Sequence, residues 1–205
     1  MIKEILPGVF HWVTFHEEIE EDVHSYYFCT TDPAVLIDPR VPNEEMAWFK
    51  NQNPPKHIFL TNRLHYRNSN RFIASFGAKV WCHSTGLHEF SKKQKVHGFN
   101  HGVRLPGDVL ALEVGVLCPE ETAFYFPQSG GILAIGDALV RYDGELGFVP
   151  DALMGENPKA VKKGLHHIFF KHLEREFDHL LFAHGEPWIG GAKLGLRRFL
   201  EAFQE

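Results

Sequence analysis

The chain has 205 residues, of which 44% are hydrophobic and 23% are charged, and its formal net charge is −5. This balance is that of a globular protein with a substantial core, and the negative charge argues against nucleic-acid binding. No apolar run approaches the roughly 20 residues that span a bilayer, and the amino-terminal segment lacks an apolar signal core. The three cysteines form no CxxC pair. We therefore expect a cytoplasmic protein with no membrane anchor.

Short apolar segments separated by turns alternate with helical patterns along the chain. Predicted strands cover, in order, residues 8–15, 25–30, 34–37, 58–60, 79–82, 110–117, 122–126, 132–135 and 180–183. Predicted helices cover residues 44–50, 69–76, 158–174 and 191–203, with Asn43 and Asn157 as expected caps. Residues 142–154 are expected to form a long loop. This pattern indicates two sheets packed face to face with helices outside.

Six short segments in a fixed order resemble parts of the metallo-β-lactamase superfamily. They are Asp22–Phe28, Ala34–Pro39, Ile58–Thr61, Phe76–Trp81, Ile135–Asp137 and Phe182–Pro187. The resemblance extends over roughly residues 6–200. It implies the α/β fold of that family, a four-layer αββα sandwich of two mixed sheets flanked by helices, formed here by a single domain over residues 1–205.

The resemblance also implies a site at the ends of the strands. Family members hold two metal ions that share a bridging hydroxide, and their histidine and carboxylate ligands suit zinc, iron or manganese. Asp137 matches the family's bridging aspartate, and His184 matches the histidine of its late His-Gly motif.

The family's T-H-x-H-x-D-H metal motif is eroded in this chain. When the motif is aligned on Thr61, its four ligand positions are occupied by Asn62, Leu64, Tyr66 and Arg67, and His65 falls on a spacer. A register shifted to make His65 the third histidine leaves Asn62 and Leu64 at ligand positions. The next expected histidine, in a separate segment, is Leu117, with Cys118 beside it. Neither register restores the motif.

Asp137, His184 and His65 are therefore the candidate metal ligands and catalytic residues. Such a set could hold one divalent metal, zinc or iron, with water completing the coordination shell, but not a tight dinuclear pair. The absence of any bound metal is the other interpretation of the same residues.

Removing metal ions from a pocket that keeps Asp137 leaves a carboxylate in need of a partner. We predict that Arg67 or Arg63 occupies the vacated metal space and pairs with Asp137 or lies within reach of it, because guanidinium binds carboxylate through two hydrogen bonds. Surface arginines on a loop are the alternative. Arg40 and Arg141 would converge on the same place and favour an anionic small-molecule ligand. The predicted ligand-binding residues are Arg67, Arg63, Asn62, Arg40 and Tyr66.

Two functional hypotheses follow. The first is a homologue that binds a small molecule in a reworked pocket and has little or no hydrolytic activity. The alternative is a metal-dependent hydrolase in which His184, Asp137 and His65 hold a single weakly bound metal, and a metal-bound water attacks an ester, thioester or phosphoester. Neither hypothesis involves nucleic acid or a membrane, and both are compatible with a homo-oligomer.

Overall fold

A computed structural model describes residues 1–203, with only the backbone described at position 45. Within these residues the first sheet has seven strands in sequence order: β1 (Lys3–Leu6), β2 (Val9–His16), β3 (Glu21–Phe28), β4 (Val35–Ile37), β5 (His57–Phe59), β6 (Lys79–His83) and β7 (Val96–Phe99). The second sheet has six strands in the spatial order β15 (Trp188–Ile189), β14 (His179–Phe182), β11 (Ile132–Ile135), β10 (Thr122–Phe126), β9 (Val109–Glu113) and β8 (Arg104–Leu105). β12 (Leu139–Tyr142) and β13 (Glu145–Phe148) form a separate hairpin.

Four α-helices and several short 3-10 turns complete the described chain. The helices are α1 (Glu45–Lys50), α2 (Ser69–Phe76), α3 (Pro158–His172) and α4 (Ala192–Ala202). The 3-10 turns are η1 (Arg63–Tyr66), η2 (Ser84–Glu89), η3 (Gln128–Gly130) and η4 (Asp151–Leu153). No helix within residues 1–203 is both long and apolar enough to cross a bilayer.

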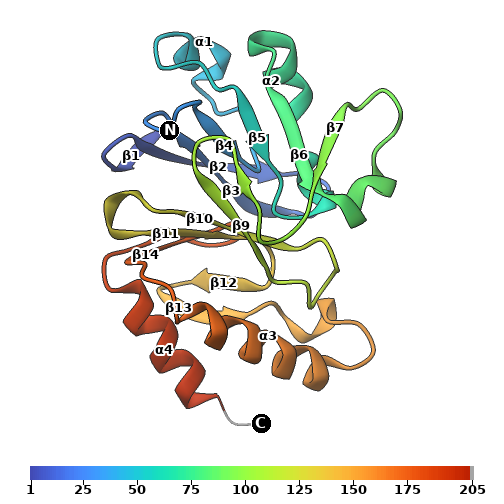
Figure 1. Ribbon diagram of the computed structural model, residues 1–205, viewed down its shortest axis with the longest axis vertical. Helices are drawn as coiled ribbons and strands as arrows, with labels where there is room; N and C mark the ends of the chain where they lie inside the picture. The colour runs from blue at the N-terminus through green and yellow to red at the C-terminus, as the bar shows by residue number, and fades with distance from the viewer. Residues whose placement is uncertain (204–205) are drawn as a thin grey trace.

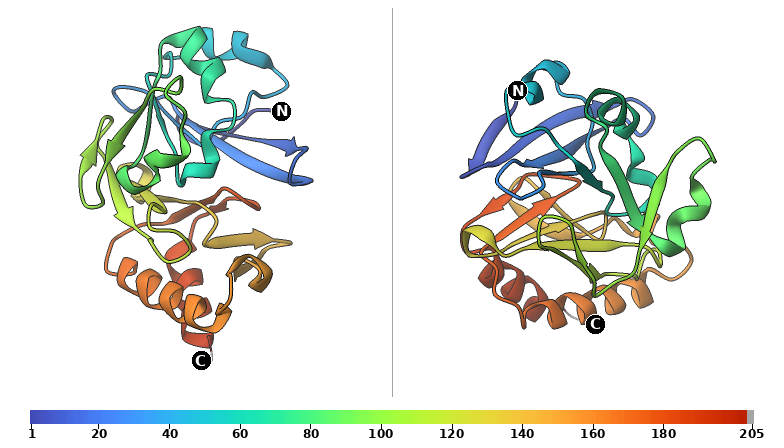
Figure 2. Two further views of the ribbon diagram at one scale, coloured as in Figure 1. Left: turned by 90° about the vertical axis from the view of Figure 1, so that its right-hand side faces the viewer. Right: turned by 45° about the horizontal axis from the view of Figure 1, so that its top comes forward.

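The two sheets stack face to face, with α1 and α2 outside the first sheet and α3 and α4 outside the second (Figures 1 and 2). Three clusters of buried side chains hold these layers together. One lies between the sheets and includes Phe28, Phe59 and Phe124. The others lie between each sheet and its helices, around Phe49 and Phe169. Because each sheet is covered on both faces, its central strands are almost wholly apolar. The predicted αββα sandwich of two mixed sheets is confirmed.

Parallel pairing in each sheet decides where the polar loops gather. In the first sheet β4 pairs in parallel with β5, and Ile37 is opposite Phe59. In the second sheet β11 pairs in parallel with β14, and Ile135 is opposite Phe182. The loops that follow these strands therefore leave each sheet at one edge, where side chains from both sheets can meet.

Most predicted boundaries are confirmed to within a few residues, whereas the strands β1, β7, β8, β12, β13 and β15 were not predicted. Asn157 caps α3 by accepting a hydrogen bond from the Ala160 N–H, whereas Asn43 does not cap α1, which begins after Glu44 with no side-chain cap. The predicted strand over residues 110–117 ends at Glu113. The expected loop over residues 142–154 contains the strand β13, which pairs with β12, and the turn η4.

Candidate functional site

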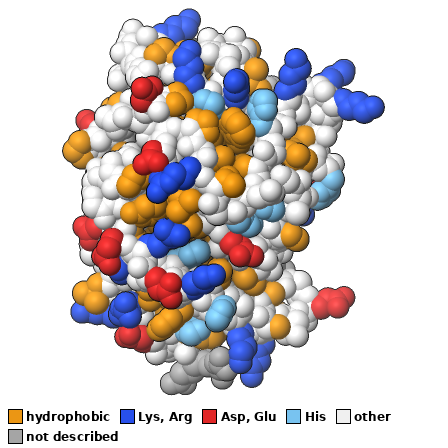
Figure 3. Space-filling model, in the orientation of Figure 1, with side chains coloured by type: hydrophobic (Ala, Val, Ile, Leu, Met, Phe, Trp, Pro, Cys, Tyr) orange, Lys and Arg blue, Asp and Glu red, His pale blue; other side chains and the backbone are white. Residues whose placement is uncertain are grey.

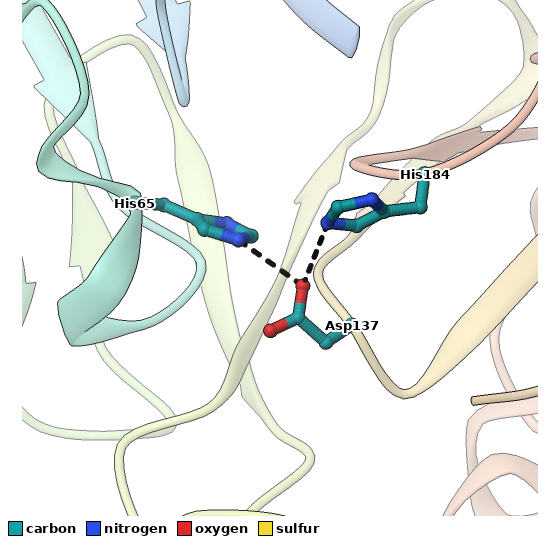
Figure 4. A group of neighbouring side chains, drawn as sticks. All are labelled: His65, Asp137 and His184. Carbon is teal, nitrogen blue, oxygen red and sulfur yellow. Dashed lines mark ion pairs between the residues drawn. The ribbon is translucent and has the colours of Figure 1, made fainter. Parts of the chain in front are cut away.

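Asp137, His65 and His184 converge at the edge of the sheets where the loops gather. His65 Nε2 lies 3.1 Å from Asp137 Oδ1, and His184 Nε2 lies 3.3 Å from the same oxygen. His65 comes from η1 beside the first sheet, whereas Asp137 and His184 follow β11 and β14 of the second sheet. Figure 4 shows both rings turned towards the carboxylate. The prediction that these three residues share one site matches this geometry.

The turn η1 decides which residue of the eroded motif enters the pocket. Asn62 begins the turn, and its side-chain oxygen accepts a hydrogen bond from the Leu64 N–H at 2.9 Å. His65 is then buried, while the Leu64 side chain is 63% exposed. Neither alignment of the metal motif could show this, because the inward-facing position depends on the path of the turn.

Asp38 forms the inner half of the pocket together with Thr61 and His65. The Thr61 N–H donates to Asp38 Oδ1 at 2.9 Å, and the Thr61 hydroxyl donates to Asp38 Oδ2 at 2.6 Å. His65 Nδ1 lies 2.9 Å from the same Oδ2. Burial by itself lowers the pKa of His65, but the charges of Asp137 and Asp38 outweigh it and raise the pKa to about 9. Asp38 was not among the predicted site residues, although a carboxylate directly after a buried strand at this edge was a usable indication.

Asp137 is ionised and has several partners within the protein. The Asn62 side-chain amide donates to Asp137 Oδ2 at 2.8 Å. Burial opposes ionisation, yet the positive charge of His65 and the contacts with His184 keep the pKa of Asp137 well below its usual value. Asp137 Oδ1 is buried, and neither imidazole contact has the geometry of a hydrogen bond. That oxygen therefore has two imidazole nitrogens nearby, those of His65 and His184, but no aligned hydrogen bond.

His184 lies in the outer half of the pocket, with Glu21 and Tyr142 beside it. His184 Nδ1 is 3.2 Å from Glu21 Oε2, and the Tyr142 hydroxyl donates a hydrogen bond to Glu21 Oε1. Glu21 and Tyr142 are each 42% exposed. The sequence around Glu21 is an acidic run that resembles a solvated turn, so this contact was not predicted.

The arginines do not pair with Asp137. Arg67 Nη1 donates to the backbone carbonyls of His24 and Asp38, each at 2.8 Å, and Arg63 pairs with Glu120. The predicted direct pair is therefore wrong, because His65, His184 and Asn62 already surround the carboxylate. Arg67 still lies close enough to matter: burial lowers its pKa, and the charges of Asp38 and Asp137 oppose that change.

The other predicted ligand-binding residues lie away from the Asp137 carboxylate. Arg40 pairs with the exposed Glu17 at 2.9 Å. Tyr66 packs its ring against Phe90, with ring centroids 5.8 Å apart. Arg40 and Arg63 are thus paired with acidic side chains of the protein itself, and their binding of an anionic ligand stays a prediction. The ring contact gives no direct support for Tyr66 as a ligand-binding residue.

The segment in which the family has a further histidine ligand also lacks that ligand here. Leu117 packs against the core between the second sheet and its helices. Glu121 is fully buried, and its Oε1 accepts a hydrogen bond from the Ala138 N–H at 2.7 Å. Burial, reinforced by the nearby charge of Asp137, raises the pKa of Glu121 to about 8, so it is largely protonated at neutral pH. Glu121 therefore holds the loop that carries Asp137 through its hydrogen bond with the Ala138 N–H.

A groove of about 970 Å³ lies beside the outer half of the pocket. Glu21, His24, Tyr142 and Gly185 are among the residues that line it. In its wall His11 Nε2 lies 2.8 Å from His24 Nδ1, and the two rings stack. The groove therefore reaches the residues next to His184, and a small molecule could approach the pocket through it.

The three converging residues fit one metal ion of the kind that the fold family implies. One ligand atom from each of His65, Asp137 and His184 lies within 4.8 Å of the others. In each ring Nε2 faces Asp137, and Nδ1 lies beside a second carboxylate, that of Asp38 for His65 and that of Glu21 for His184. Carboxylates occupy the same position behind the histidine ligands of many metal sites. Within residues 1–203 no other group of three such residues comes together in this way. A single ion fits, and a second lacks ligands.

No protein-family model matches the chain, and no curated protein matches its sequence. Solved structures do match. An archaeal metallo-beta-lactamase superfamily protein, ST1585 from Sulfolobus tokodaii, is 16% identical with a TM-score of 0.67, over 95% of this chain and 85% of that one. TTHA1623 in a di-iron-bound form is 21% identical with a TM-score of 0.66, over 94% and 100%. The flavodiiron protein from Giardia intestinalis is 15% identical with a TM-score of 0.66, over 98% and 58%. At these identities the likeness shows the fold alone: the chain has the metallo-beta-lactamase fold.

Proposed function

We propose that this protein binds a small molecule in a reworked metallo-beta-lactamase-fold pocket and is not a dinuclear hydrolase. The observation behind this proposal is that the pocket's two carboxylates already have partners within the protein. Asp38 accepts hydrogen bonds from Thr61 and faces His65. Asp137 faces His65 and accepts from Asn62. Protein groups thus supply the positive charge that metal ions supply in the family.

The partners that we propose are limited by charge and shape. On the face drawn in Figure 3 the basic side chains are interspersed with acidic and hydrophobic ones, and the formal net charge of the chain is −5. We therefore propose a small-molecule ligand, with no nucleic acid or membrane surface, for a protein of the cytoplasm. The groove beside His184 is the place where that ligand would enter.

A specific observation favours a second candidate, a hydrolase with one metal ion. His65, Asp137 and His184 present three ligand atoms around one point. Bound there, a metal would supply an activated water for attack on an ester, thioester or phosphoester. His65 would first have to lose the proton that its pKa of about 9 implies. At neutral pH that loss costs about 3 kcal/mol, which weakens metal binding roughly 100-fold.

Metal analysis of the wild-type protein, purified without a chelator, distinguishes these candidates. The proposed function predicts substoichiometric zinc and iron in a folded protein. It also predicts that Zn²⁺ added at neutral pH binds weakly by calorimetry. One tightly bound ion per chain, lost in Asp137→Ala, would instead establish the mononuclear site.

A matched control separates loss of the site from loss of charge. Asp108→Ala removes an exposed aspartate that lies between β8 and β9, pairs with Arg104 and contacts none of the three converging residues. This variant should leave both metal content and Zn²⁺ binding unchanged. If it lowers them as much as Asp137→Ala does, the metal signal comes from non-specific surface binding.

A further inference from the structure

The groove beside His184 has its own set of lining residues. One wall comes from β2 and β3 of the first sheet, and the other comes from the end of β12 and the loop after β14. Its volume of about 970 Å³ is in the range of small-molecule sites. Of the arginines predicted to converge on an anion, only Arg141 is part of the lining. What the groove could hold therefore depends on groups that the sequence did not single out.

Carboxylates outnumber cations along the groove. The cations are Lys3, Arg141 and the amino terminus, which lies 3.8 Å from a carboxylate oxygen of Glu44. Arg141 is engaged on the protein, because its guanidinium lies 4.9 Å over the Trp188 ring and its Nη1 donates to the Pro187 carbonyl at 3.3 Å. The carboxylates are those of Glu21, Asp22, Asp143 and Glu186. Asp22, Asp143 and Glu186 are exposed. The charge that faces the groove is therefore negative, and a cleft concentrates such a field.

A pair of buried imidazoles lies in the same groove. His11 and His24 are only 9% and 5% exposed, yet both line it. His11 Nε2 lies 2.8 Å from His24 Nδ1, and that hydrogen bond needs a lone pair on one of the two nitrogens. Burial lowers the pKa of His11 to about 4 and that of His24 to about 3, so both rings are neutral at neutral pH. The pair therefore adds no positive charge.

The neutral pair always has one free acceptor. Whichever ring donates the shared proton keeps a lone pair on its other nitrogen, which is Nδ1 in His11 and Nε2 in His24. Among the described residues no hydrogen bond of the protein uses either of these nitrogens. A side chain that is more than nine-tenths buried and lacks a partner on one nitrogen favours a ligand that brings a donor to it.

We propose that the groove binds an organic cation, an ammonium, amidinium or guanidinium group on an apolar body. Asp22 and Asp143 balance its charge, and the His11–His24 pair accepts one of its N–H groups. A metal ion does not fit, since no three ligand atoms of these described residues lie within 4.8 Å of one another. Val13 and Tyr142, 37% and 42% exposed, offer surface to the apolar body. This inference rests on the proposed function in one respect, that a small molecule enters here.

The test compares three probes of similar shape on the full wild-type chain at neutral pH: benzamidine, a cation; benzamide, which is neutral; and benzoate, an anion. Titrations followed by ¹H–¹⁵N NMR of the backbone report both affinity and place. Benzamidine should bind about tenfold more tightly than benzoate and shift the amide signals of Val13, His24 and Gly185. Added salt should weaken its binding, because the carboxylates at the groove are exposed.

Two conservative variants test the carboxylates. Asp22→Asn and Asp143→Asn should each weaken benzamidine binding about threefold, and about tenfold together. Asparagine keeps the shape of the side chain and tolerates the φ of +52° at Asp143. Asp108→Asn is the matched control, because it removes an exposed carboxylate that pairs with Arg104 outside the groove. It should leave the affinity unchanged.

The imidazole pair is tested by the double variant His11→Phe/His24→Phe, which should weaken benzamidine binding about tenfold. Its spectrum also reports folding, and if it does not fold, the carboxylate variants decide alone. Equal affinities for the three probes, tighter binding of benzoate, or an equal loss in Asp108→Asn would overturn the proposal. Failure of the proposed function would show separately, as stoichiometric metal in the wild type, and the order of the probes would still decide what the groove binds.

Discussion

The two histidines of the pocket are held in contrasting ways. His65 lies in the inner half, where its partner Asp38 is 1% exposed and is also bonded twice by Thr61. His184 lies in the outer half, where its partner Glu21 is 42% exposed and is bonded by a single tyrosine hydroxyl. The same pair of groups, an imidazole and a carboxylate, therefore occurs once in a buried network and once at the mouth of a groove.

This difference shows where the fold fixes the site and where it leaves it adjustable. A buried charged network is costly to break, because each group left without a partner retains its desolvation penalty. An exposed pair contributes little to stability, since water replaces either partner. The inner half should therefore govern folding, and the outer half should govern what the pocket binds.

Asp38→Asn should have the largest effect on this contrast. It removes the charge that His65 faces while it preserves the shape of the side chain, so the free energy of unfolding should fall by about 3 kcal/mol. Urea unfolding at neutral pH measures the change. Asp108→Asn, in the exposed pair with Arg104, should change it by less than about 1 kcal/mol. Equal losses in the two variants would show that the inner network has no special role.

The inner half should also respond to alkaline pH. The pKa of His65 in the folded protein is about 9, above the value of 6.5 expected for the unfolded chain. The stability that it contributes is therefore complete below pH 6.5 and is lost as the pH rises through 9, by about 3 kcal/mol. Urea unfolding at the two ends of this range should show a smaller loss for His65→Gln than for the wild type. Because the pKa of Glu121 is also raised, the free energy of unfolding should still fall somewhat with rising pH in both proteins.

The wall of the groove should respond in the opposite direction. Burial, and then the neighbouring charges, lower the pKa of His24 to about 3 and that of His11 to about 4. Because these values are below 6.5, the stability contributed by the neutral rings is present above pH 6.5 and is lost as the pH falls towards them. Between pH 7 and 4.5 we expect His24→Gln to reduce the loss of stability by about 2 kcal/mol.

His88→Gln is the control for this acid response, since His88 is exposed on η2 and its ring Nδ1 lies against the Thr85 carbonyl. This variant should lose as much free energy of unfolding between the two pH values as the wild type does. If His24→Gln retains the full acid sensitivity, the buried pair of rings is not its source.

Glu21→Gln should have the smallest effect on stability. The exposed Glu21 carboxylate is expected to contribute less than about 1 kcal/mol to the free energy of unfolding. Thermal unfolding should therefore be nearly unchanged. A loss as large as that of Asp38→Asn would remove the distinction between the two halves of the pocket.

The sequence by itself determined the layers and the strand ends. The central strands could be read because burial on both faces makes them apolar, as in Ile58–Phe59 and Ile132–Ile135. Asp137 and His184 could be placed together because each follows a strand in a recognisable short motif. The fold, and Asp137, His184 and His65 as candidate site residues, could therefore be inferred from the sequence.

The tertiary structure decided how those residues are used. Asn62 and His65 enter the pocket while Leu64 does not because of the path of the turn η1, which neither alignment register specifies. Asp38 faces His65, 27 positions away in sequence, and Glu21 faces His184, 163 positions away. Arg67, predicted to face Asp137, instead donates to two backbone carbonyls. The interaction energy of a charged group depends on which partners the packing brings within a few ångströms, and a local sequence pattern does not specify those partners.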